Sequence, residues 1–148
     1  TDFAKPFIPP ACSLLLWKIW KGKLPLQPLL QRIGISVDLV CHIFLESYEN
    51  TSHIFLSYKF SRIIWCYMHQ IFNFSMNFHS VDGLMQAISA ANFNEQVHAL
   101  FLAATAAGFD FIWKSRNELF NNTQPRFHNG VLTIHSAIHM ASNIQTGY

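Results

Sequence analysis

The sequence of 148 residues is poor in charge. Charged residues make up 12% of it, whereas hydrophobic residues make up 51% and aromatic residues 15%. An average soluble protein has about 25% charged residues. The formal net charge is only +2 with histidine counted as neutral, which is too small to indicate a nucleic-acid-binding protein by composition alone. The composition therefore predicts a folded chain with a sizeable core and a sparsely charged surface.

Recognisable catalytic motifs are also missing. The eight acidic residues form no evident carboxylate set for binding a catalytic metal, and there is no Tyr-x-Asp-Asp polymerase motif. Neither a Gly-x-Ser-x-Gly nucleophile motif nor a phosphate-binding Gly-Lys loop is present. His135 and His139 lie four residues apart, but two histidines without a third ligand are typical of an ordinary protein surface. We therefore expect no enzymatic activity and no small-molecule substrate.

Disulfide and membrane signals are absent as well. Three cysteines, at positions 12, 41 and 66, cannot form a disulfide framework, and we expect Cys12 and Cys66 to be ordinary buried thiols. The longest mostly apolar stretch, residues 97–113, is interrupted by a glycine and an aspartate. It falls short of the roughly 18–20 apolar residues that a membrane-spanning helix needs. The sequence therefore predicts an intracellular protein, cytoplasmic or nuclear, with no membrane partner.

Hydrophobic spacing and helix-boundary residues predict a mostly α-helical chain, because the alternation typical of strands is weak throughout. Ser13 and Ser80 are expected to cap two helices, and Asn92 with Glu95 has capping-box spacing at the start of another. The predicted fold is a single helical domain with one loop-rich segment near residues 36–53. The expected helices cover about 13–21, 25–33, 51–72, 80–90, 92–120 and 130–144.

One stretch has the spacing of a metal site but only half of its ligands. Cys41 is followed by Phe44, His53 and Tyr58, and cysteines in the second and fourth places would give C-x2-C-x8-H-x4-C. That is the spacing of a Cys3His zinc site, with a close cysteine pair and a distal His/Cys pair. As written, Cys41 and His53 can serve as ligands and Phe44 offers no donor. The phenol of Tyr58 is a poor zinc ligand at neutral pH, because an ordinary tyrosine titrates at about 10.

We therefore expect no bound zinc and no other cofactor. Cys41 and His53 are then packing residues, and the rings at positions 44 and 58 fill the former site with apolar bulk. His42 and Cys66 are the two residues that could replace the missing ligands. His42 adjoins Cys41, and Cys66 lies about two helical turns beyond Tyr58, too far to take its place without rearrangement.

Several short runs occur in order along the chain. They are Ser-Leu-Leu-Leu-Trp-Lys-Ile-Trp at 13–20, Lys-Gly-Lys-Leu-Pro at 21–25, Leu-Gln-Arg-Ile-Gly-Ile at 30–35, His-Ile-Phe at 53–55, Phe-Ser-Arg-Ile-Ile-Trp at 60–65 and Ile-Trp-Lys-Ser-Arg-Asn at 112–117. Together they resemble the zinc-binding region of plant non-LTR (LINE-type) retrotransposon reverse transcriptases. In that family the region lies after the polymerase and before a ribonuclease H domain.

This resemblance implies two segments, with residues 10–72 as the zinc-binding-like region and 80–145 as a helical extension that precedes ribonuclease H in the parent. The four family ligands would fall on positions 41, 44, 53 and 58, of which only the first and third match. Phe and Tyr codons are each one base from a Cys codon. Such replacements are expected when an element decays without selection.

The function implied is a non-catalytic accessory segment of a reverse transcriptase polyprotein, now a decayed fragment. Its parent would contact RNA or DNA and the neighbouring polymerase and ribonuclease H domains. The alternative is a helical protein-interaction module, reused by the host without a metal. The sparsely charged surface and the aromatic run at residues 73–79, which we expect to be exposed, motivate this alternative.

Basic residues near aromatic ones mark the candidate nucleic-acid interface. Lys18, Lys21, Lys23 and Arg32 cluster around the first two expected helices. Lys59 with Arg62 and Lys114 with Arg116 form two smaller groups. The four tryptophans, at 17, 20, 65 and 113, could form a stacking platform, but we expect them to be core anchors.

Overall fold

The computed structural model describes residues 3–26, 32–34, 49–76, 78–121 and 123–147. Within these ranges the chain forms helices and no strand, so the predicted mostly α fold is confirmed. Cys41, His42 and Phe44 lie outside the described residues. The helices are α1 (Pro10–Trp20), the π-helix η1 (His53–Ser57), α3 (Lys59–Phe72), α4 (Val81–Ser89), α5 (Glu95–Phe120) and α6 (Phe127–Thr146).

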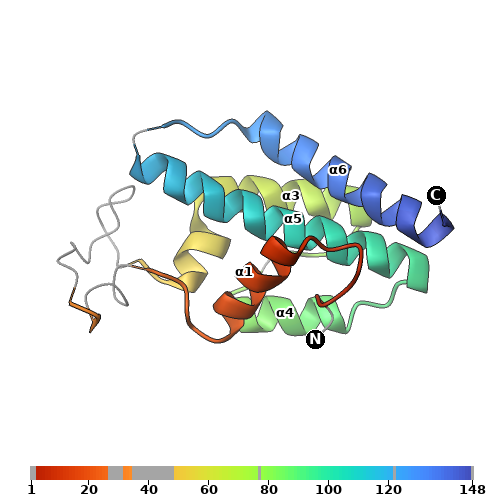
Figure 1. The fold of residues 1–148 in the computed structure, drawn as a ribbon, viewed down its shortest axis with the longest axis horizontal. Coiled ribbons are helices and arrows are strands. Elements are labelled where there is room, and N and C mark those ends of the chain that lie inside the picture. Colours follow the sequence, from red (N-terminus) through yellow and green to blue (C-terminus); the bar gives the residue numbers. More distant parts are fainter. Residues whose placement is uncertain (1–2, 27–31, 35–48, 77, 122, 148) are drawn as a thin grey trace.

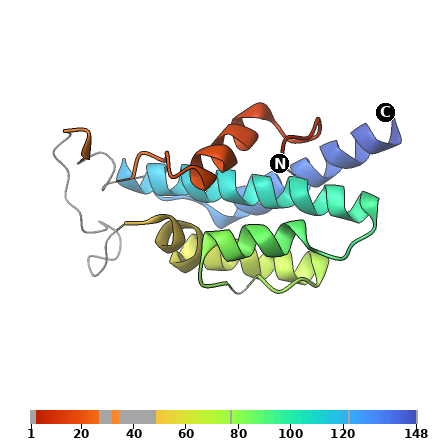
Figure 2. The ribbon, with the colours of Figure 1, turned by 90° about the horizontal axis from the view of Figure 1, so that it is seen from below.

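Helix α5 is the centre of the fold. Helices α1, α3 and α6 all contact it, and α1 and α3 lie on opposite sides of it (Figures 1 and 2). Small residues over 103–108 are buried, which lets neighbouring helices approach closely. A Cβ atom on Gly108 would come within 3.0 Å of the Trp65 indole, so the absence of a side chain there makes room for the ring.

The largest core contacts are aromatic. The rings of Phe55 and Phe109 have centroids 5.2 Å apart, and those of Trp65 and Phe109 are 5.1 Å apart. These three residues come from η1, α5 and α3, and all are buried. Tilted and edge-to-face ring pairs of this kind add to the free energy gained by burying apolar area. The core therefore joins the first half of the chain to α5.

Two of the three predicted helix caps are wrong. Helix α1 begins at Pro10, because proline at the first helical position has its φ preset and lacks only an N–H that the helix does not use. The hydroxyl of Ser13 instead donates to the Phe3 carbonyl at 2.8 Å. Asn94 rather than Asn92 caps α5, accepting from the Val97 amide at 2.9 Å. The predicted cap Ser80 is confirmed, since it accepts from the Gly83 amide.

The single helix expected over 51–72 is broken at Tyr58. This residue has an extended backbone, with ψ of 144°, between η1 and α3. Side chains of α3 satisfy the carbonyls that the break leaves without a helical partner. The hydroxyl of Ser61 donates to the carbonyl of Ile54, and the Trp65 indole donates to the carbonyl of Phe55 at 2.6 Å. Local spacing could not reveal this break, because each segment alone has a helical pattern.

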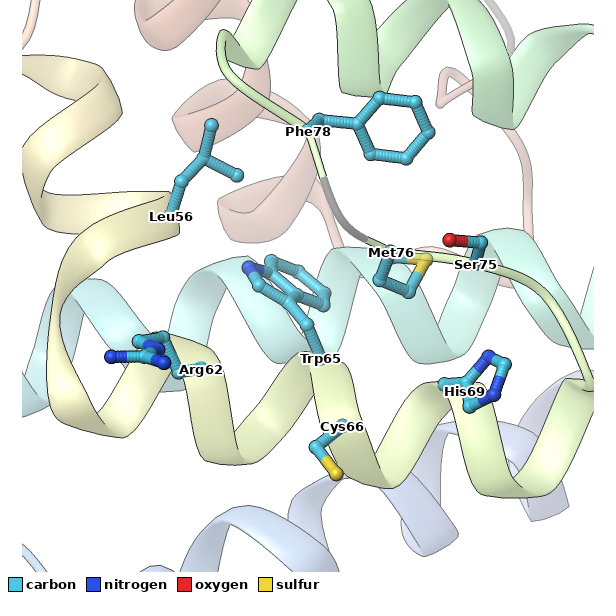
Figure 3. A pocket seen from close by; sticks show the side chains of 8 residues that line it. All are labelled: Leu56, Arg62, Trp65, Cys66, His69, Ser75, Met76 and Phe78. Carbon is cyan, nitrogen blue, oxygen red and sulfur yellow. The ribbon is translucent and has the colours of Figure 1, made fainter.

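The aromatic run after α3 is not exposed as expected. Met76 is buried, and Phe74 and Phe78 are half-buried against the core. Phe74 lies with its ring centroid 5.0 Å from that of Phe101 on α5. Figure 3 shows Ser75, Met76 and Phe78 on the segment that returns alongside α3, with Trp65 facing it. Hydrophobic rings in a loop therefore cover the core here.

No helix in the described part of the chain is both long enough and apolar enough to cross a membrane.

Candidate functional site

Three of the predicted basic residues lie at the C-terminal end of α1. Lys18 is half-buried in the last turn, whereas Lys21 and Lys23 are exposed just after it. Gly22 ends the helix in a left-handed conformation, with φ of 63°. The amide of Lys23 donates to the Lys18 carbonyl at 2.8 Å and that of Gly22 donates to the Ile19 carbonyl at 3.2 Å. This Schellman motif fixes the lysines at the negative end of the helix dipole.

Arg32 lies beside the same end of α1. It is exposed, and it lines a small cavity of about 230 Å³ together with Gly22 and Glu49. The structure thus brings the four predicted basic residues to one region. This grouping gives the protein a local concentration of positive charge that its net charge of +2 conceals.

The tryptophans fall into two classes. Trp65 is 3% exposed and Trp113 is half-buried against the core, so the expectation of core anchors is correct for these two. It is wrong for Trp17 and Trp20, which are 48% and 57% exposed. Both lie outside the buried face of α1, which is formed by Leu15, Leu16 and Ile19. The run of large apolar residues in α1 exceeds what one buried face can hold.

The distal half of the predicted metal site lies next to the core. The imidazole of His53 and the phenol ring of Tyr58 meet edge to face, with centroids 5.5 Å apart. Tyr58 is 1% exposed, so its ring fills space in the protein interior. Burial lowers the pKa of His53, partly opposed by the nearby Glu49 carboxylate. Positions 53 and 58 are therefore close enough to belong to one site.

The two described positions of this site, 53 and 58, supply one ordinary zinc ligand, the His53 imidazole. Across the described ranges, no group of three or more His, Cys, Asp or Glu side chains could hold a metal ion. Tyr58 presents a phenol where the spacing calls for a thiolate, and a structural zinc needs four nitrogen or sulfur ligands. Cys41 and Phe44 fall outside the described residues, so their contribution stays a prediction.

A buried ion pair was missed by the sequence analysis. The guanidinium of Arg116 on α5 donates to both carboxylate oxygens of Glu49, from Nε at 2.5 Å and from Nη2 at 2.8 Å. The Arg116 side chain is 7% exposed and that of Glu49 is 1% exposed. The guanidinium also lies over the rings of Trp113 and Phe120, at 5.1 and 4.2 Å from their centroids. The pair ties the segment before His53 to α5.

Arg116 is therefore held inside the protein by its ion pair, although the sequence analysis grouped it with Lys114. Lys114 is exposed and binds the Asp110 carboxylate at 2.7 Å. One sequence signal did mark Arg116 as buried. It lies four residues after Ile112 and four before Phe120, which places it on the apolar side of α5. Its partner Glu49 is 67 residues away, and no local pattern identifies it.

The cysteines differ in exposure. Cys12 is buried as expected, but Cys66 is exposed on α3, contrary to the prediction. Figure 3 shows Cys66 beside a pocket of about 320 Å³, with Arg62 and His69 on the same helix. Burial raises the pKa of the Cys12 thiol, and the nearby Asp110 carboxylate raises it further while Lys114 lowers it. Since the thiolate is the reactive form, Cys12 is protected from alkylation both by its burial and by its raised pKa.

We expect iodoacetamide to alkylate Cys66 faster than Cys12 in the folded protein, by roughly tenfold or more. The comparison is made by mass spectrometry in a Cys41→Ser variant, so that only these two thiols remain. The Cys12 rate should keep rising above the ordinary thiol pKa of about 8.5, because its own pKa is raised. Equal rates in the folded protein and in urea would contradict the burial of Cys12.

Comparison with protein families matches residues 3–65 to the family described as zinc-binding in reverse transcriptase. The resemblance found in the ordered sequence runs is thereby confirmed for this region, without any indication of a plant or LINE origin. No curated protein and no solved structure matches the chain.

Proposed function

We propose that this chain, whose residues 3–65 match the family described as zinc-binding in reverse transcriptase, is a non-catalytic accessory segment that contacts nucleic acid. The observation that carries the proposal is the gathering of Lys18, Lys21, Lys23 and Arg32 at one end of α1, inside the matched region. Lysine and arginine side chains neutralise phosphates and release counterions, whatever the base sequence. In the parent polyprotein, this region would hold RNA or DNA beside the polymerase and ribonuclease H domains.

We also propose that the segment is a decayed member of this family, and the altered ligand positions support this. Tyr58 occupies the place of the last ligand and is packed inside the protein. The contacts that hold the neighbouring chain are protein contacts, among them the Glu49–Arg116 pair and the indole of Trp65 on the Phe55 carbonyl. The fold around position 53 thus has anchors that need no metal.

Binding to a labelled single-stranded oligonucleotide should weaken steeply as salt rises. The expected slope of log K against log salt is about −0.7 for each phosphate that is neutralised. Each of Lys21→Ala and Lys23→Ala should lower the affinity and reduce the slope by roughly one unit or less. Fluorescence anisotropy between 50 and 200 mM salt measures both effects.

Lys59→Ala is the matched control, because Lys59 is also exposed but lies on α3, across α5 from α1 (Figure 2). It should leave affinity unchanged if the site is at the end of α1. Affinity equally reduced by all three variants would show diffuse attraction rather than a site. No binding at 50 mM salt would refute the proposal.

A helical protein-interaction module is the second candidate. Its support is a row of exposed apolar residues on α6, comprising Leu132, Met140 and Ile144. The aromatic run at 73–79 no longer supports it, because Met76 is buried and Phe74 packs on the core. Association with a protein that persists at high salt, with no oligonucleotide binding, would favour this candidate.

A further inference from the structure

One side of α1 exposes large apolar side chains in a row. Leu14, Trp17 and Trp20 follow one another at intervals of three residues and are 51%, 48% and 57% exposed. With Met85 and Ser89 of α4 they line a groove of about 470 Å³. Burial of two indoles would contribute strongly to stability, so their exposure indicates a surface that binds something.

The groove lies next to the basic residues at the C-terminal end of α1. The ammonium of Lys21 lies 4.2 Å from the ring centroid of Trp20, which is a cation–π contact. Lys23 is held close by through its hydrogen bond to the Lys18 carbonyl. Among the residues described, no acidic side chain lines the groove. Aromatic rings on α1 and cations just after its last residue thus occur side by side.

We propose that this face of α1 is a base-stacking site for single-stranded nucleic acid. Bases would stack on the indoles of Trp17 and Trp20, while the lysines at the end of the helix neutralise the adjoining phosphates. The inference rests on the proposed function and specifies that the nucleic acid is single-stranded. A duplex does not satisfy the site, because its bases are already stacked and paired.

The cation beside the ring argues for this occupant over an apolar protein surface. A hydrophobic helix that docked on Trp20 would bring apolar groups against the Lys21 ammonium and remove it from water, at a cost in free energy. A nucleotide that stacks on the same ring brings a negative phosphate toward that ammonium. The groove and its nearby charges are therefore complementary to a strand of nucleotides.

The test measures anisotropy of a labelled 12-nucleotide oligo-dT, and of a matched duplex, with the full chain. Trp20→Ala and Trp17→Ala should each weaken single-strand binding about 5- to 150-fold, the range for loss of one stacked base. Trp20→Phe keeps a stacking surface and should recover most of the affinity. The salt slope should stay unchanged in the tryptophan variants, because they remove no charge.

Phe127→Ala is the matched control, since Phe127 is an exposed ring at the start of α6, outside the groove. Far-UV circular dichroism confirms folding of each variant. Unchanged affinity in the tryptophan variants, while Lys21→Ala still weakens binding, would overturn the stacking site and leave the proposed function standing. Equal affinity for duplex and single strand would also overturn it.

Two further outcomes separate the inference from its premise. If the unmodified chain binds neither oligonucleotide, the proposed function and the stacking site both fail. If the chain instead self-associates at high salt, and Leu14→Ala and Trp20→Ala abolish that association, the groove is covered by a second copy. The stacking site is then wrong.

Discussion

Replacing Arg116 by methionine is expected to destabilise the fold by about 3–5 kcal/mol. Methionine fills part of the volume but leaves the Glu49 carboxylate, which is 1% exposed, without the guanidinium that donates to both its oxygens. A buried charge that loses its partner carries a large desolvation cost. The measurement is the free energy of unfolding from urea titration, followed by far-UV circular dichroism.

Lys114→Met is the matched control for this prediction. It removes a cation from the same helix, but the Lys114 side chain is 68% exposed and the Asp110 side chain is 15% exposed, so the carboxylate left behind keeps contact with water. The expected loss is below about 1 kcal/mol. The double variant Glu49→Leu/Arg116→Met should recover much of the loss caused by Arg116→Met, because neither charge is then left buried. Equal effects of Arg116→Met and Lys114→Met would show that the buried pair is dispensable.

The double variant Phe44→Cys/Tyr58→Cys is expected to bind one zinc ion per chain. With Cys41 and His53 it restores the C-x2-C-x8-H-x4-C spacing. The side chains at 53 and 58 already meet in the structure, so no large movement is needed on that side. Structural zinc sites of this kind bind with about 10 kcal/mol or more at neutral pH, which corresponds to a Kd below about 100 nM. Competition with a chromogenic chelator measures the affinity.

Two controls define the ligand set. Adding Cys41→Ser to the double variant should abolish tight binding, because it removes one of the four ligands. The single change Tyr58→Cys should destabilise the apo protein, since it empties the space of a ring that is 1% exposed. Tight binding of one zinc by the unmodified chain would contradict the ligand assignment. His42 and Cys66 would then be the next residues to replace.

Local patterns were sufficient for several of the helices and for some of their ends, whereas the helix expected over 25–33 lies largely outside the described residues. Helix α5 was expected from its apolar content and breaks at Asn121, and Ser80 caps α4 as its side chain chemistry predicts. These features depend on residues a few positions apart. The break at Tyr58 depends on donors in α3 that reach back to η1, so helical spacing alone could not predict it.

The grouping of the basic residues could be predicted from the sequence, but the exposed aromatic surface beside them could not. The lysines near the end of α1 lie within six residues of one another in the sequence, and the turn that ends the helix keeps them together. Trp17 and Trp20 were expected inside because indoles are hydrophobic, yet α1 has one buried face and more large apolar residues than that face can hold. The Glu49–Arg116 pair joins residues 67 positions apart, and a single sequence does not indicate such partners.

The partners of the buried pair lie on different sides of the family boundary. Glu49 is inside the matched region 3–65, and Arg116 is on α5, beyond it. A chain that stopped at residue 65 would contain Glu49 without Arg116. It would also lack α5, on which Trp65 packs. The packed unit in this structure therefore extends beyond the residues that the family model matches. A chain cut between residues 65 and 95 would keep Glu49 and Trp65 but lose both of their partners on α5.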